Sequence, residues 1–236
     1  MTRGADMRSV LAKSSALATA SVLFTFPYFH YLMFVVLDKD RFPEGIDPWG
    51  VLFTQLFLLF ILCLLSSMIG FSFSKRLKLP GFGNWGHFIR SMPSLLVLGA
   101  VMIGLSYFFF DRHFCEISPL SYPKELLYLI WLPFKGAFTE EIILRLCLVT
   151  LSVGLLRNKG AGVVLVSALA PLFTIKYFFF IGMKAGFSYL FVTQFLLSFS
   201  ANLLLGYLFV THGLLYAMAL KFLFDIKYVV VCWAIG

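Results

Sequence analysis

The chain has 236 residues, of which 61% are hydrophobic, 18% aromatic and only 13% charged, with a formal net charge of +8. Soluble domains are nearer half apolar and a quarter charged, so this composition excludes a water-soluble globule, a disordered chain and a disulfide scaffold. The apolar runs are long and do not alternate with polar residues, which excludes an outer-membrane barrel. The sequence therefore predicts an all-α fold, a polytopic bundle of transmembrane helices.

Seven segments are long and apolar enough to be membrane spans, since a helix needs about 20 apolar residues to cross ~30 Å of hydrocarbon. The fourth is too long for one simple span, and Pro133 and Gly136 predict a kink there, or a break into two pieces. We therefore expect seven or eight spans in a single integral membrane domain, residues 1–236. The segments are residues 14–37, 49–73, 91–110, 126–156, 160–182, 187–210 and 213–235.

The basic residues lie in short clusters between the spans, which is typical of a topological signal and predicts no nucleic-acid partner. The second loop holds Lys75, Arg76, Lys78 and Arg90 without an acid, whereas the first and third loops are acidic on balance. By the positive-inside rule the N-terminus is cytoplasmic. The small size and the absence of targeting tails favour a prokaryotic plasma membrane.

Ionisable side chains inside membrane spans are costly and are functional candidates by default. All of the candidates lie in the C-terminal half of the chain, whereas the first three spans carry only His30. The candidates are Lys135, Glu140, Glu141, Arg145, Lys176, Lys221, Asp225 and Lys227.

The densest group is Glu140-Glu141-Ile-Ile-Leu-Arg145. On a helix Glu141 and Arg145 are one turn apart and are expected to pair, while Glu140 is displaced by about 100° toward another neighbour. Arg145 would then hold one carboxylate ionised and leave the other as a base that can activate water. The alternative is an ion-pair cluster that only locks helices together.

This pattern resembles the CPBP intramembrane peptidases, which include the type II CAAX prenyl endopeptidases and the Abi-like immunity proteins. The family motif EExxxR is matched by Glu140, Glu141 and Arg145. The motif FxxxH is matched by Phe173 with Tyr177 in place of the histidine, and HxxxN/D is matched with Lys221 in place of the histidine and Asp225 retained. The resemblance covers residues 126–230, the CPBP-like core region.

The resemblance implies hydrolysis of a peptide bond by water that a motif glutamate activates, with two histidines that bind metal or stabilise the oxyanion. Both histidines are replaced here, by Tyr177 and Lys221. A protonated lysine is not a metal ligand and tyrosine rarely is, so we expect no metal and no other cofactor. Instead, the ammonium of Lys221 or Lys176 is expected beside Glu140 or Asp225, where it would neutralise the carboxylate.

The turn at residues 157–160 predicts that spans four and five are antiparallel, which places Glu140 and Tyr177 at similar depth. Three functions follow from these residues. The first is an intramembrane endopeptidase with Glu140 as base and Tyr177 and Lys221 as oxyanion donors. The second is a catalytically silent member acting as a membrane scaffold, immunity or partner-binding protein, and the third is a small transporter. The expected partners are the lipid bilayer and a membrane-anchored or prenylated peptide or small membrane protein.

Overall fold

The structure is a computed structural model that describes residues 2–36, 45–117, 122–173 and 188–235. The described residues form helices and short connections, with no strand among them, which confirms the all-α prediction. In the first half the α-helices are α1 (Thr2–Tyr31), α2 (Pro48–Arg76), α3 (Trp85–Ser106), α4 (Arg112–Ile117) and α5 (Leu126–Lys135). In the second half they are α6 (Thr150–Leu156), α7 (Lys159–Leu169), α9 (Ser188–His212), α10 (Leu214–Asp225) and α11 (Lys227–Ile235). A 3-10 turn, η7 (Ala170–Phe173), follows α7.

Four helical segments of the described chain are long and apolar enough to cross a membrane: Met7–Val36, Pro48–Arg76, Trp85–Glu116 and Tyr189–His212. The segment Lys159–Leu172 is apolar but shorter. The last expected span, 213–235, is divided into α10 and α11 at Ile226. The structure thus supports a membrane protein, and the total of seven or eight spans stays a prediction.

The expected break in the fourth segment is absent, because residues 126–156 follow one continuous helical path. Pro133 ends no helix, since its ring lies within α5. The irregularity takes another form: two wider π-helical segments, η5 (Gly136–Glu140) and η6 (Ile142–Val149), lie between α5 and α6. π-Helical turns are rare and often occur at functional sites. Glu140 is the last residue of η5, Arg145 lies within η6, and Glu141 lies between the two segments.

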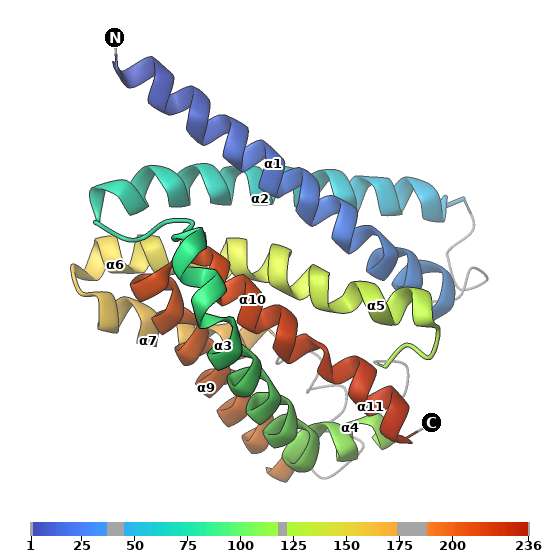
Figure 1. The fold of residues 1–236 in the computed structure, drawn as a ribbon. Coiled ribbons are helices and arrows are strands. Elements are labelled where there is room, and N and C mark those ends of the chain that lie inside the picture. Colours follow the sequence, from blue (N-terminus) through green and yellow to red (C-terminus); the bar gives the residue numbers. More distant parts are fainter. Residues whose placement is uncertain (1, 37–44, 118–121, 174–187, 236) are drawn as a thin grey trace.

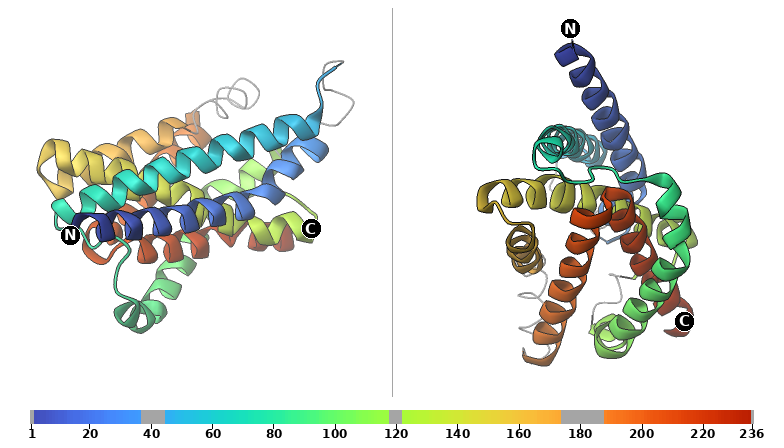
Figure 2. Two further views of the ribbon diagram at one scale, coloured as in Figure 1. Left: turned by 90° about the horizontal axis from the view of Figure 1, so that it is seen from above. Right: turned by 60° about the vertical axis from the view of Figure 1, so that its left-hand side comes forward.

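Helix α10 lies at the centre of the molecule, where it packs against α3, α9, α5 and η5 (Figure 1). Helices α1 and α2 lie together along one side of the bundle, and the N-terminal part of α1 projects beyond it (Figure 2). The main hydrophobic core joins α10 to α6, α7 and α9 through buried side chains such as Val153, Val163, Phe209 and Leu220. The site described below is therefore built on a central, well-packed helix.

The first turn of α10 is fixed by the loop between α2 and α3. The amide of Leu214 donates to the carbonyl of Gly81 at 2.8 Å, and that of Leu215 donates to Phe82 at 3.0 Å. These bonds satisfy backbone donors that a helix start leaves unpaired. Gly213 has φ 108°, and a Cβ there would lie 2.6 Å from the backbone of Gly83, so this close approach requires glycine.

Candidate functional site

An alternating chain of cations and carboxylates crosses from α5 to α10. Lys135 Nζ lies 3.2 Å from Glu140 Oε1, and Lys221 Nζ lies 3.1 Å from Glu140 Oε2. Lys221 Nζ also lies 3.1 Å from Asp225 Oδ1, one helical turn along α10. Lys221 therefore bridges two carboxylates, and both oxygens of Glu140 face an ammonium group.

Glu141 turns away from this chain and pairs with Arg145. Arg145 Nε lies 3.3 Å from Glu141 Oε2, and both side chains are only 1% exposed. Neither carboxylate oxygen of Glu141 accepts a well-oriented hydrogen bond from the residues that the structure describes. The contact is therefore an ion pair without a well-oriented hydrogen bond. Glu140 and Glu141 have separate cationic partners, as expected from their offset around the helix.

Helix α9 supplies a polar stripe that the sequence analysis missed. Gln194, Ser198 and Asn202 follow one another at intervals of four residues along α9, and this spacing was the available signal. Arg145 Nη2 donates to Asn202 Oδ1 at 2.7 Å, and Asn202 Nδ2 donates to the carbonyl of Ser198 at 2.7 Å. The stripe thus holds the arginine through a second nitrogen, Nη2, while Nε faces Glu141.

These groups line a polar chamber with a volume of about 350 Å³ between α9, α10 and the π-helical segments. The side chain of Glu140 is 38% exposed, whereas those of Lys221 and Asp225 are 15% and 5% exposed. Glu140 is therefore the carboxylate that a molecule entering the chamber can reach. The chamber is lined by Glu140, Glu141, Arg145, Gln194, Lys221 and Asp225, among others.

Glycine at position 136 allows α10 to approach the π-helical segment η5. A Cβ at Gly136 would overlap Asp225 Oδ2 and lie 3.0 Å from Lys221 Cε. A side chain there would displace the Asp225 carboxylate and the Lys221 side chain, whose ammonium contacts Glu140. Gly136, at which the sequence predicted a kink or a break, thus has a packing role.

A second buried ion pair lies at the far end of the chamber. Lys227 Nζ is 3.1 Å from Asp111 Oδ1, which also accepts a 2.6 Å hydrogen bond from Tyr122, and Ser106 donates to Asp111 Oδ2 at 2.5 Å. Burial, and the negative charge of Asp111 next to it, raise the pKa of Tyr122 above its ordinary value, so the phenol stays a neutral donor. The sequence singled out Lys227, but Asp111 was assigned to a loop.

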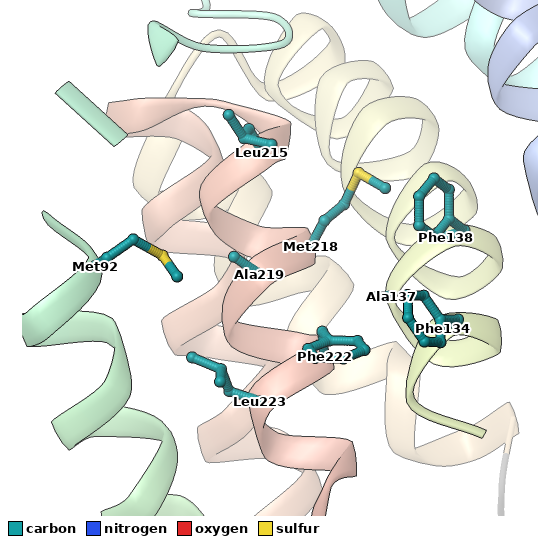
Figure 3. A pocket seen from close by; sticks show the side chains of 9 residues that line it. All are labelled: Met92, Phe134, Ala137, Phe138, Leu215, Met218, Ala219, Phe222 and Leu223. Atoms are coloured by element: carbon teal, nitrogen blue, oxygen red, sulfur yellow. The ribbon is translucent and has the colours of Figure 1, made fainter. Parts of the chain in front are cut away.

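An apolar groove lies on the other side of α10, between α3 and α5 (Figure 3). Its volume is about 270 Å³, and its lining carries almost no polar surface. Met92 contributes from α3, Phe134 from α5, and Met218 and Phe222 from α10. Helix α10 therefore separates the charged chamber from the apolar groove.

Five of the six residues predicted for the site are brought together: Glu140, Glu141, Arg145, Lys221 and Asp225 all line the chamber. Tyr177, and Lys176 beside it, lie outside the described residues, so their expected positions stay predictions. Lys135 joins the site as a second partner of Glu140. Within the described ranges, no three His, Cys, Asp or Glu side chains are grouped as metal ligands would be.

The arrangement is chemically well suited to holding charge and poorly suited to accepting a proton. A glutamate acting as general base must take a proton from water, and two ammonium groups at its oxygens oppose that step by stabilising the ionised form. Lysines in the same place could stabilise a developing oxyanion on a bound carbonyl. The site thus contains an oxyanion donor together with a weakened base.

Comparisons of the chain with family models, with curated proteins and with solved structures find no match. The class that fold and site define is an all-helical membrane protein with a buried, charge-paired chamber. Any family placement depends on the three motifs.

Proposed function

We propose that this chain is a membrane-embedded protein of the CPBP type that binds a membrane-anchored peptide or small membrane protein without hydrolysing it. In this proposal it is a protein of seven or eight spans in a prokaryotic plasma membrane, with a cytoplasmic N-terminus. The observation that carries the proposal is the position of Lys221, 3.1 Å from both Glu140 and Asp225. Because this ammonium and that of Lys135 occupy the carboxylate of Glu140, the base required for peptide hydrolysis is neutralised.

Peptide-bond hydrolysis is the second candidate, and one observation favours it. The side chain of Glu140 is 38% exposed to the chamber, so water and a scissile carbonyl have access to it. In that case Glu140 is the base, and Lys221, with Tyr177, donates to the oxyanion.

Reconstitution in vesicles with a library of membrane-anchored peptides, some of them prenylated, separates the two. We expect mass spectrometry to find no cleavage by the wild-type protein. A photoreactive amino acid at Gln194, on the polar stripe, should crosslink peptide, whereas the same group at Leu196, which is 56% exposed on α9, serves as the lipid-facing control.

Two results would contradict binding without hydrolysis. Cleavage by the wild type that disappears in Glu140→Gln would establish the peptidase instead. Equal crosslinking from positions 194 and 196 would show that the chamber has no preference for a peptide. Cleavage that appears only in Lys221→His would support the proposal, since it would show that the lysine suppresses the chemistry.

A further inference from the structure

The ion pair of Glu141 and Arg145 has several buried hydrogen-bonding groups that are not used. Both carboxylate oxygens of Glu141, and Nε and Nη1 of Arg145, make no hydrogen bond with the residues that the structure describes. Nη2 of Arg145 differs, because it donates to Asn202 Oδ1 at 2.7 Å. Buried polar groups are nearly always hydrogen-bonded in folded proteins, since an unpaired one loses its hydration without compensation. The pair therefore retains the capacity to bind a further polar group.

The unused groups are of both kinds and lie next to each other. An ionised carboxylate only accepts hydrogen bonds, and a guanidinium only donates them. Arg145 Nε lies 3.3 Å from Glu141 Oε2, and both side chains line the polar chamber. A partner for the whole pair must therefore offer a donor and an acceptor close together. Each side chain is 1% exposed, so hydrogen bonds formed there are shielded from water.

The charge balance of the chamber favours an uncharged partner. Its lining contains three cations and three carboxylates, and each of these ions has a partner of opposite sign within 3.3 Å. A further charge among these paired ions would lack a counter-ion and would be costly to desolvate, whereas a neutral group adds hydrogen bonds without charge. The six ions are Arg145, Lys221, Lys227, Glu140, Glu141 and Asp225.

The main chain of a peptide meets both requirements. It is uncharged, and a residue other than proline carries one N–H donor and one C=O acceptor. In an extended chain these two groups of one residue point to the same side, which is how residues of neighbouring strands exchange two hydrogen bonds. In a transmembrane helix they are already bonded within the helix, because hydrocarbon offers no other partner. Free N–H and C=O groups thus belong to an unwound stretch of a membrane-anchored peptide.

We propose that Glu141 and Arg145 bind the main chain of an unwound, uncharged stretch of the peptide. Glu141 accepts from a peptide N–H, and Arg145 Nη1 donates to the C=O of the same residue. This inference rests on the proposed function, since it names the part of the peptide that the chamber holds. Glu140 keeps its two ammonium partners in this complex, so binding of this kind needs no base.

Single ester substitutions in the peptide test the proposal. The full chain with a photoreactive amino acid at position 194 is reconstituted in vesicles, and association constants are obtained from the crosslink yield at increasing peptide concentration. Each peptide has one amide replaced by an ester, which lacks the N–H donor and has a weaker acceptor. We expect the association constant to fall at least about tenfold at one or two adjacent positions, as for a hydrogen bond to a charged group, and to change less than about twofold elsewhere.

The terminal group of the peptide tests the preference for a neutral ligand. Peptides that end at the sensitive position are compared as the carboxamide and as the carboxylate. We expect the carboxamide to bind at least about tenfold more tightly, since an unpaired carboxylate is costly to bury. Equal or tighter binding of the carboxylate would show that the site takes a charged group, and it would overturn the proposal.

Paired variants make the test specific to the ion pair. Glu141→Leu with Arg145→Met removes both ions together, and it should reduce the effect of every ester to less than about twofold. The matched control is Arg112→Met with Glu116→Leu, an exposed cation and carboxylate with the same four-residue spacing on α4, which should leave the ester effect unchanged. Because the ester series uses the unaltered pair, it decides the outcome even where the first double variant does not fold.

The failure of this inference and that of the proposed function are distinguishable. Association constants that are equal for all esters, or an ester effect that persists without the ion pair, would overturn the inference, while capture of the peptide would still support the proposed function. Absence of crosslinked peptide from position 194 would contradict the proposed function and this inference with it.

Discussion

At the scale of single residues, Lys221 determines what the chamber can do. A histidine at this position would be neutral near pH 7 and able to bind metal or share a proton. The lysine is a cation near pH 7, and its ammonium contacts two carboxylates. Its contacts with Glu140 and Asp225 turn an acidic motif into a neutral network.

Removing Arg145 should destabilise the protein strongly. Arg145→Ala leaves Glu141, which is fully buried, without its cation, and breaking a buried pair costs about 3–5 kcal/mol in soluble proteins. We expect a large fall in the thermal unfolding temperature in detergent. The control is Arg157→Ala, an exposed arginine, which should unfold like the wild type. Wild-type stability of Arg145→Ala would disprove the buried pair.

A methyl group at position 136 should destabilise the fold, whereas a methyl group at position 104 should not. Gly136→Ala forces a Cβ into Asp225 and Lys221, so we expect a loss of about 1–3 kcal/mol in the free energy of unfolding. Gly104→Ala, in α3, meets no atom within 4 Å and should be neutral or stabilising by up to ~1 kcal/mol. Thermal melts of both variants make the comparison, and equal melting temperatures would refute the close approach of α10.

At the scale of the elements, the sequence predicted helices well and their local irregularities poorly. Long apolar runs specify α2, α3 and α9 because length and composition alone decide a membrane helix. The π-helical segments were not predicted, since the hydrophobic pattern of a sequence indicates a helix but does not distinguish a π-helical turn within it. The chamber residues Glu140 and Lys221 could be predicted because charges are rare inside spans.

The element that sequence reasoning missed most clearly is the junction of η3 (Tyr107–Asp111) with α11. Asp111 follows an aromatic run and was assigned to a loop, yet it is fully buried against Lys227. Only the tertiary fold brings residues 111 and 227 together, so no local pattern could pair them. By contrast, the stripe on α9 has a period of four and could have been recognised.

A double-mutant cycle on this junction tests its contribution. Lys227→Met strands the Asp111 carboxylate, and we expect a loss of about 3–5 kcal/mol in the free energy of unfolding. Adding Asp111→Leu removes the stranded charge and should recover part of that loss, because an apolar pair avoids the desolvation cost of ions. Denaturant titrations of both single variants and the double variant give the coupling energy. Additive effects would show that the two side chains do not interact.

At the scale of the whole molecule, the charges of the described ion pairs cancel. The buried and half-buried ion pairs of the described residues comprise four cations and four carboxylates, so the remainder of the chain carries the full formal charge of +8. The cations are Lys135, Arg145, Lys221 and Lys227, and the carboxylates are those of Asp111, Glu140, Glu141 and Asp225. Pairing each of these cations with a carboxylate limits the cost of placing the eight ions in a low-dielectric bundle.

The hydrogen bonds from Leu214 and Leu215 to the carbonyls of residues 81 and 82 act as an anchor for α10. Lys221 lies seven residues beyond Leu214, which is about 10 Å along the helix axis. Its height within the bundle is therefore set from the loop between α2 and α3. We expect a change in the conformation of that loop to shift the start of α10, and with it the position of Lys221 Nζ relative to the Glu140 carboxylate.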